Sequence, residues 1–202
     1  MVLAAYCIGS LATSVWIGKS FYHIDVREFG SGNAGATNTF RVLGKRAGIP
    51  VLILDILKGC VAVALAYFSK YEPGSSGFIN LEIGLGVAAL IGHIFPVFAG
   101  FRGGKGVATL LGVVVCIAPA ASALALIVFL IVLFSSRIVS LSSMLAGVSF
   151  PLFLIFLLGN SNPVLTVFSV VVSALLIVTH RKNIQRLLKN QESRVNLFAT
   201  RK

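Results

Sequence analysis

Three short segments gather glycine, hydroxyl, amide and basic side chains between long apolar runs. The first reads Gly30-Ser31-Gly32-Asn33-Ala34-Gly35-Ala36-Thr37-Asn38 and is followed by Arg41. Closely spaced glycines leave backbone amides open, and the small polar side chains add hydrogen-bond donors. A flexible linker is the alternative, but two Asn, two Thr and a cation between Ser31 and Arg41 favour an anion-binding loop. It lacks the Gly-Lys-Ser/Thr ending of a nucleotide-binding P-loop.

The second segment places two cations among bare backbone, in Arg102-Gly103-Gly104-Lys105-Gly106. An apolar run follows at once, so a helix is expected to begin here. Side-chain charge, open amides and the helix dipole would then all attract an anion. The alternative is a basic membrane anchor whose glycines allow tight helix packing. His93, upstream, is either a functional group or a structural hydrogen-bonding residue inside the membrane.

The third segment runs from His180 to Glu192 and combines His180 and Asn183 with many cations. Those two residues are one helical turn apart and would share a face at the membrane edge. The cations and the apolar residues are spaced as on an interfacial helix that binds anionic membrane lipid. A weaker polar element, ending at Ser143, opens another apolar run.

The chain offers little support for metal, redox or nucleic-acid chemistry. Its three cysteines, Cys7, Cys60 and Cys116, lie in apolar runs without ligand or redox spacing. No metal and no cofactor are therefore expected. No basic-aromatic module is present either, so nucleic acid is not an expected partner.

The amino-acid composition indicates which kind of fold must position these three segments. The 202 residues are 57% hydrophobic and only 11% charged, with a mean hydropathy of +0.96. A soluble domain of this size cannot hide so much apolar surface, and a disordered chain would not contain it. The sequence therefore predicts an all-α integral membrane protein. The excess of 17 Lys and Arg over 6 Asp and Glu fits cytoplasmic loops beside anionic lipid.

The distribution of basic residues between the two sides of the membrane indicates how many spans there are. The run from Gly106 to Ser136 has 31 residues without a charge and contains Pro119, which disfavours helix just before it. Two spans here place 15 basic residues on one side and only Lys70 on the other, whereas one span gives 7 against 9. The positive-inside rule therefore predicts seven transmembrane helices, with the N-terminus out and the C-terminus in. The predicted spans, within one domain of residues 1–202, are about 2–18, 49–69, 81–99, 106–118, 119–135, 138–158 and 163–179.

The three segments resemble the signature loops of the bacterial acyl-phosphate:glycerol-3-phosphate acyltransferase family. The matching stretches are Gly30–Asn38 with Arg41, Gly92-His93 with Phe101–Thr109, and His180–Leu187. The resemblance covers nearly the whole chain and implies a multi-pass enzyme of the bacterial cytoplasmic membrane, with its active site facing the cytoplasm. It implies acyl transfer from acyl phosphate to glycerol 3-phosphate, giving lysophosphatidate and phosphate in phospholipid biosynthesis. Two residues depart from the family pattern: Arg102 where Lys is usual, and Asn190 where Gly is usual.

The resemblance also assigns roles to residues. Lys105 and Arg41 would neutralise phosphate, while His180 and Asn183 would orient glycerol 3-phosphate. Ser31 would complete the catalytic set. Further substrate-binding groups would come from Gly30, Gly32, Asn33, Thr37, Asn38, Arg102, Gly103, Gly104, Gly106 and Ser143.

Two questions stay open from the residues. From the residues the candidate proton acceptor is His180, since an imidazole ordinarily titrates near neutral pH, whereas the resemblance implies a substrate phosphate, which we favour. An organic-phosphate transporter is the alternative function, and a non-catalytic anchor subunit is a second. A transporter requires a continuous polar path. Within the predicted spans the ionisable residues are only Asp55, Lys58, Glu82 and His93, of which the first two are expected to pair.

Overall fold

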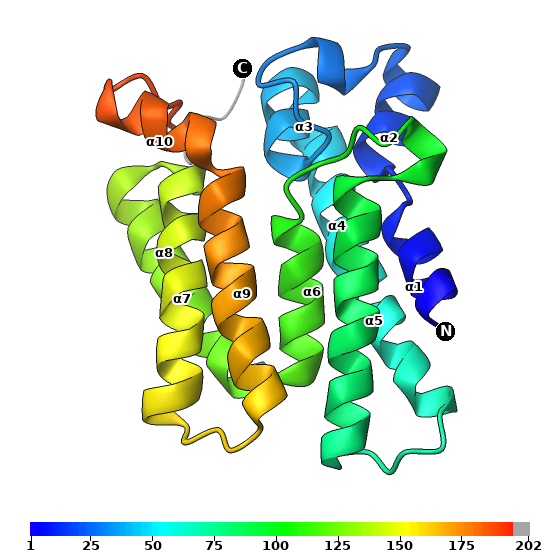
Figure 1. Ribbon diagram of the computed structural model, residues 1–202. Coiled ribbons are helices and arrows are strands. Elements are labelled where there is room, and N and C mark those ends of the chain that lie inside the picture. The colour runs from blue at the N-terminus through cyan, green and yellow to red at the C-terminus, as the bar shows by residue number, and fades with distance from the viewer. Residues whose placement is uncertain (196–202) are drawn as a thin grey trace. The chain divides into compact units, whose positions relative to one another are not determined.

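The structure is a computed structural model that describes residues 1–195. These residues form helices and loops, with no strand among them, as predicted for an all-α protein. They divide into two compact units, residues 1–119 and residues from 120 onward. Figure 1 draws the first unit in blue to green and the second in light green to red.

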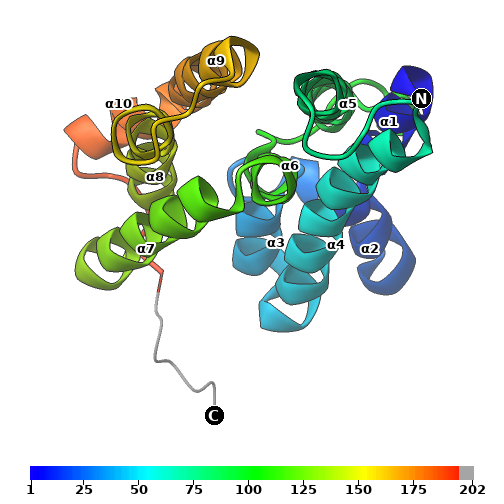
Figure 2. The same cartoon turned by 90° about the horizontal axis from the view of Figure 1, so that it is seen from below.

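The first unit is centred on two long helices, α4 (Lys45–Ala64) and α5 (Ser76–Ile94). These two pack against each other, and both also contact α1 (Val2–Gly9) and α6 (Val107–Ile117), as Figure 2 shows end-on. The remaining elements are α2 (Thr13–Tyr22), α3 (Ala36–Leu43) and the 3-10 turns η1 (Val26–Glu28), η2 (Leu65–Phe68) and η3 (Val97–Ala99). The two glycine-rich segments are therefore the connections that precede α3 and α6.

The first predicted span, residues 2–18, is not one continuous helix. It consists of α1 and α2, which meet at an angle of 40° across residues 10–12. The Lys58 ammonium donates to the Leu11 carbonyl at the break, at 2.9 Å, and Thr13 Oγ1 donates to Asp55 Oδ1 at 2.7 Å. The break persists because α4 supplies polar partners to backbone and side-chain groups that the helix leaves unpaired. The predicted pairing of Asp55 with Lys58 is confirmed, with Nζ to Oδ1 at 2.8 Å.

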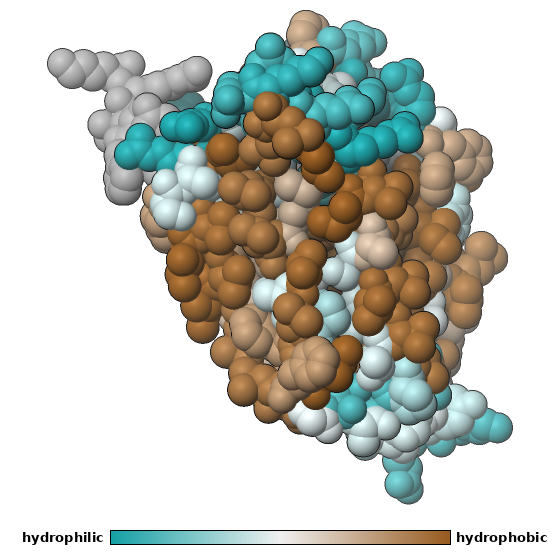
Figure 3. All heavy atoms as spheres, turned by 60° about the vertical axis from the view of Figure 1, so that its left-hand side comes forward, coloured by the Kyte–Doolittle hydropathy of each residue, from teal (hydrophilic) through white to brown (hydrophobic). Residues whose placement is uncertain are grey.

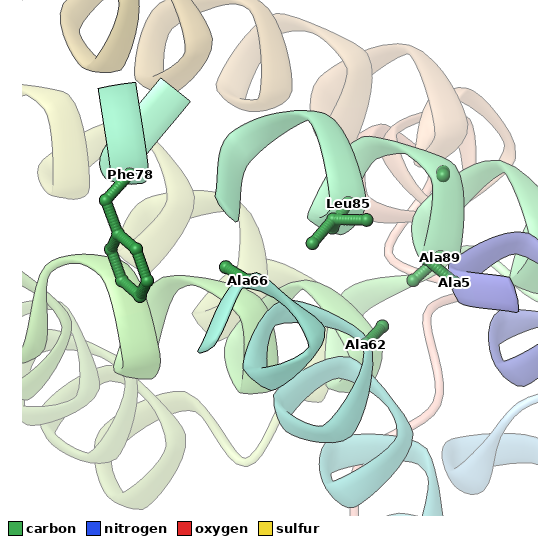
Figure 4. Packing of buried hydrophobic residues seen from close by; sticks show 7 residues of the cluster. Ala5, Ala62, Ala66, Phe78, Leu85 and Ala89 are labelled. Carbon is green, nitrogen blue, oxygen red and sulfur yellow. The ribbon is translucent and has the colours of Figure 1, made fainter. Parts of the chain in front are cut away.

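Small side chains form much of the core of the first unit. Figure 4 shows Phe78 and Leu85 of α5 packed with alanines of α1, α4, η2 and α5, namely Ala5, Ala62, Ala66, Ala88 and Ala89. Without large side chains between them, helix backbones can approach closely, which favours association inside a membrane. The close approach is extreme at Gly9, where an added Cβ would collide with the Ala89 backbone. This packing makes α1, α4 and α5 a firm support for the two loops.

The second unit contains α7 (Pro119–Ser136), α8 (Val139–Leu152), the π turn η4 (Phe153–Leu157), α9 (Pro163–Thr179) and α10 (Arg181–Leu188). The predicted helix break at Pro119 is confirmed, because α6 ends at Ile117 and Pro119 is the first residue of α7. Helices α8 and α9 pack side by side. Helix α10, also predicted, turns by 57° from α9 at His180.

Among residues 1–195, four helices are long and apolar enough to cross a membrane, and there are up to six candidates when each bent pair, α1–α2 and α9–α10, is counted as one. Helix α6 is apolar but has only 11 residues. Figure 3 shows a broad band of hydrophobic side chains, with hydrophilic residues above and below it in this view. Large hydrophobic residues of α7, such as Ile127, Ile131 and Phe134, are exposed. The positive-inside count also includes Arg201 and Lys202, which lie outside the described residues.

Candidate functional site

Asn38 organises the first glycine-rich loop. Its side chain is only 2% exposed, and Oδ1 accepts from the amide and the hydroxyl of Ser31 at 2.8 and 3.0 Å. Its Nδ2 donates to the carbonyls of Val26 and Phe29 at 2.8 and 3.1 Å. An amide side chain with both groups engaged has little capacity left for a ligand. Asn38 therefore holds Ser31 in place through contacts within the protein, and its expected part in substrate binding stays a prediction.

Helix α3 was missed by the sequence analysis, which treated residues 30–41 as a loop. It begins after Gly35 and carries Thr37 and Arg41 on its exposed side. Ala36, Phe40 and Leu43 have the i, i+4, i+7 spacing of a helix face, a signal that could have identified it. The position of Arg41 is therefore set by α3, which packs against α4.

The glycines of the first loop allow its tight turns. Gly30 and Gly32 have φ values of +62° and +72°, which other residues adopt rarely. A Cβ on Gly30 would collide with Asn38 Oδ1, so the contact that holds Ser31 requires glycine there. Asn33 is half-buried, and its Oδ1 lies beside Gly35. Ser31 itself is exposed at the surface of this folded loop.

The second loop is fixed to the end of α5. The amides of Gly103 and Gly104 donate to the carbonyls of Ile94 and His93 at 3.1 and 3.2 Å. These two amides are therefore engaged within the protein, and the expected part of this backbone in holding a substrate phosphate stays a prediction. A Cβ on either glycine would collide with His93, which explains the residue type at both positions. This loop also carries the basic side chains of Arg102 and Lys105, and it leads into the first amides of α6, which have no acceptor in their own helix.

Lys105 and Gly106 lead directly into α6, as predicted. Gly106 precedes the first helical residue and has φ +79°, while Lys105 is half-buried and Arg102 is exposed. A cation beside the positive end of a helix favours an anion at that point. His93 lies beneath this loop with 5% exposure, and its Nδ1 is 3.2 Å from Thr109 Oγ1 in α6. Of the two alternatives for His93, the structure supports the structural hydrogen bond.

Arg27 connects the two loops and was not identified from the sequence. Its Nη1 donates to the carbonyls of Ala99 and Arg102 at 2.7 and 3.1 Å. Its Nε and Nη2 donate to the two carboxylate oxygens of Asp25 at 2.9 and 2.7 Å. The hydrogen bonds from Arg27 hold the pKa of Asp25 well below its usual range, and Asp25 in turn raises the pKa of Arg27.

His180 and Asn183 belong to the second unit, at the turn between α9 and α10. His180 is 3% exposed, and its Nδ1 lies 2.8 Å from the Leu176 carbonyl. A carbonyl can only accept, so Nδ1 carries a proton and donates it to the Leu176 carbonyl. Asn183 is also buried, and its Nδ2 donates to Glu192 Oε1 at 2.7 Å.

Glu192 is a second residue whose place the sequence did not reveal. Besides Asn183, it accepts from Ser140 Oγ at 3.0 Å and from Arg186 Nε at 2.7 Å. Burial raises its pKa, but the hydrogen bonds from Arg186, Asn183 and Ser140 outweigh this and hold the pKa below the usual value. Glu192 thereby joins the chain after α10 to α8 and to Asn183.

Ser143 has a hydrogen-bond partner in its own helix, and its expected part in substrate binding stays a prediction. It is buried in α8, and its hydroxyl donates to the Val139 carbonyl at 2.9 Å, within its own helix. The oxygen can still accept a hydrogen bond, but its proton is not directed at a ligand. Among residues 1–195, no three His, Cys, Asp or Glu side chains are grouped as metal ligands would be.

Asn190, which stands where the resemblance leads us to expect glycine, adopts the backbone conformation that we expected there. Asn190 has φ +54°, in the left-handed region where the family usually has glycine. Its amide donates to the Leu187 carbonyl, and the Gln191 amide donates to Arg186, at 3.0 and 2.7 Å. These two bonds form the Schellman motif that ends α10. The prediction that Asn preserves a helix cap is confirmed.

Comparisons with known proteins cover almost all of these residues. Residues 1–190 match the family described as glycerol-3-phosphate acyltransferase. A relative of that name from Enterococcus faecalis is 43% identical over 97% of this chain and 91% of its own length. The crystal structure of PlsY (YgiH), an integral membrane glycerol 3-phosphate acyltransferase in its glycerol 3-phosphate form, is 39% identical with a TM-score of 0.86, covering 98% and 97% of the two chains. Its lysophosphatidic acid form is 38% identical with a TM-score of 0.81, covering 96% and 93%.

Proposed function

The chain belongs to the glycerol-3-phosphate acyltransferase family, and from this premise we propose that it takes its acyl group from acyl phosphate. The products would be lysophosphatidate and inorganic phosphate. The similar PlsY crystal structures are of the glycerol 3-phosphate form and the lysophosphatidic acid form, and these two compounds are the acceptor and the product of such a reaction. The donor is the one implied by the resemblance of the three loops to the acyl-phosphate-dependent family, and the chemistry of the site is compatible with it.

The observation that carries this proposal is the anion site of the first unit. Lys105 precedes the first turn of α6, and Arg27 ties its loop to the loop of Ser31. An acyl phosphate offers a phosphate for such a site, and that phosphate is itself a good leaving group. Lys105 and Arg41 would neutralise it, with Ser31, Thr37 and the first amides of α6 as hydrogen-bond donors.

The reaction needs no covalent intermediate on the protein. The glycerol hydroxyl oxygen forms a bond to the acyl carbon, the bond from that carbon to the phosphate oxygen breaks, and phosphate departs with the electron pair. Cations and amides around the phosphate stabilise the charge that develops on it. Correct placement of the two substrates supplies most of the remaining acceleration.

His180 and Asn183 would orient glycerol 3-phosphate. The unprotonated Nε2 of a neutral His180 can accept a hydrogen bond from the attacking hydroxyl. A histidine base usually has a carboxylate on its other nitrogen, which stabilises the imidazolium. Here the partner of Nδ1 is the neutral Leu176 carbonyl. This difference supports a substrate phosphate as the proton acceptor.

We further propose seven spans in the bacterial cytoplasmic membrane, with the N-terminus out and the loops of the site on the cytoplasmic face. The division of 15 basic residues against one supports this topology. The cations of α10 would lie against anionic headgroups.

A single experiment separates the enzyme from a transporter. The purified protein is placed in liposomes with labelled glycerol 3-phosphate outside and a long-chain acyl phosphate in the membrane. We expect labelled lysophosphatidate that depends on the acyl phosphate, with no entry of label above empty liposomes. Uptake of glycerol 3-phosphate without product would contradict the proposal.

A further inference from the structure

We propose that Asp25 and Arg27 are positioning residues that set the spacing between the two phosphate-binding loops. This inference rests on the proposed function of those loops. The guanidinium of Arg27 spans from η1 to the second loop, where it binds the carbonyls of Ala99 and Arg102. We call the Asp25–Arg27 pair together with these two carbonyls the clasp. Arg102 is three residues before Lys105, so the clasp lies close in sequence to the lysine that we propose binds phosphate.

The other side of η1 is fixed to the first loop. The Asn38 amide donates to the carbonyls of Val26 and Phe29, and the same side chain accepts from Ser31. Thus η1 is held by Asn38 on one side and by Arg27 on the other. A continuous chain of hydrogen bonds runs from Ser31 through Asn38 and η1 to the Arg102 backbone.

The chemistry of the clasp requires arginine. Arg27 makes four side-chain hydrogen bonds in two directions, two to a carboxylate and two to carbonyls. The planar guanidinium presents its donors as a fixed fork, whereas a lysine ammonium is a single point of charge on a flexible stem. The side chains of Arg27 and Asp25 are only 13% and 11% exposed, so solvent competes weakly for these bonds.

The clasp also explains how the second loop keeps its shape. The amides of Gly103 and Gly104 fix the loop to α5, and Arg27 fixes the carbonyl of the preceding residue to η1. Loss of the clasp leaves the α5 contacts in place but frees the first loop to move relative to Lys105. Binding of acyl phosphate should then weaken, while binding of glycerol 3-phosphate, assigned to the second unit, should not.

The test uses purified Arg27→Lys, Arg27→Ala and Asp25→Asn, with Lys19→Ala as the matched control. Lys19 also contacts Asp25, at 3.3 Å, but its side chain is 58% exposed and it does not reach the second loop. We expect the Arg27 variants to lose about 10-fold to 100-fold in kcat/KM, the scale of a small misplacement of reacting groups. KM for acyl phosphate and the inhibition constant of inorganic phosphate should rise, with KM for glycerol 3-phosphate within about twofold of wild type. Asp25→Asn should show the same pattern more weakly, and Lys19→Ala should match wild type.

A purely structural role predicts a different result. It would lower kcat in proportion to the unfolded fraction and leave both KM values unchanged, and that outcome would overturn the proposal. If Arg27→Ala does not fold, Asp25→Asn, which preserves size and keeps Arg27, decides the question in the same way.

Amide hydrogen exchange tests the clasp without any substrate. Peptides that cover residues 99–106 should exchange faster in Arg27→Lys than in wild type or Lys19→Ala. Unchanged exchange would refute the clasp even if the enzyme is active. If exchange is faster in Arg27→Lys but the wild-type protein makes no lysophosphatidate, the clasp is supported and the proposed function is refuted.

Discussion

At the scale of single residues, Lys105 combines most of the features that an acyl-phosphate site needs. It lies directly before the start of α6, where backbone amides and the helix dipole both favour an anion. Glycines stand on both sides of it, and both approach α5 too closely to accept a side chain. The cation is therefore held in a loop that has no room to adapt.

Lys105→Ala should remove the charge that we propose contacts phosphate. We expect kcat/KM for acyl phosphate to fall by roughly 100-fold or more, since truncating one partner of a charged contact commonly costs several kcal/mol. Lys105→Arg keeps the charge but needs space for a wider group, so a severe loss is expected there too. Steady-state rates with Lys182→Ala as control check this, because Lys182 is an exposed cation of α10. Full activity of Lys105→Arg would show that charge alone suffices.

The His180 variants distinguish a base from an orienting group. A general base contributes about 10²-fold to 10⁴-fold, so His180→Asn and His180→Ala should lose turnover equally if His180 is the base. If it orients glycerol 3-phosphate, Asn preserves one hydrogen bond and should keep clearly more activity than Ala. We expect the second pattern, with much of the defect in KM for glycerol 3-phosphate. Equal losses confined to kcat would return His180 to the role of base.

The residues that sequence reasoning identified are those whose chemistry is visible locally. A lysine among glycines at a predicted helix start can be recognised as an anion-binding candidate without knowing the fold. Asn38, Gly103 and Gly104 were also singled out, but for contacts that the fold directs to the protein itself. Arg27 and Glu192 were missed because their partners lie far away in the sequence, about 75 and 50 residues for Arg102 and Ser140.

At the scale of elements, α10 depends on what its two ends contact. Its C-terminus is closed by the turn at Asn190, and the chain then returns so that Glu192 meets Asn183, Arg186 and Ser140. The helix has only eight residues, too few to be stable alone in water. Glu192 therefore contributes to the placement of Asn183 as well as to the stability of α10.

Glu192→Gln should lower the free energy of unfolding by about 1–3 kcal/mol at pH 7, because a charged acceptor of three bonds is replaced by a neutral one. The folded-state pKa of Glu192 is lowered, so its stabilisation is complete above the unfolded value and is lost as pH falls through the folded value. The difference between wild type and variant should therefore shrink below about pH 4.5. Denaturation midpoints measured from pH 7 to pH 4, with exposed Glu72→Gln as control, test this. A difference that grows on acidification would contradict it.

Helix boundaries were predictable wherever a single residue dictates them. Pro119 separates α6 from α7, and Pro163 begins α9. The break between α1 and α2 was not predictable, because residues 10–12 contain no proline or glycine and the break is satisfied by Lys58 of α4. Helix α3 was not predicted because the glycines and asparagine that precede it indicate a loop, although the apolar spacing of a helix is present in its sequence.

At the scale of the whole molecule, the topology depends on how the short helix α6 is interpreted. Its 11 residues extend about 16 Å, roughly half of the hydrocarbon thickness of a bilayer. Local thinning of the membrane would let α6 and α7 both cross. Only then do the basic loops collect on one face of the membrane.

Cysteine labelling tests this topology. In a background where Cys7, Cys60 and Cys116 are replaced by Ala, single cysteines are introduced at the exposed residues Lys45, Glu72 and Gln191. Lys45→Cys and Gln191→Cys should react with an impermeant reagent only from the cytoplasmic side, and Glu72→Cys only from outside. Labelling of Gln191→Cys from outside would show that residues 106–136 cross once.

The central claim, that acyl phosphate is the donor, is tested most directly by offering the purified protein each activated acyl group in turn. Glycerol 3-phosphate is supplied with a long-chain acyl phosphate, the matching acyl-CoA or the matching acyl carrier protein thioester. Lysophosphatidate is then measured by mass spectrometry alongside released phosphate. We predict lysophosphatidate and phosphate in equal amounts from acyl phosphate, and none from either thioester. Product from a thioester in the absence of acyl phosphate would contradict the account.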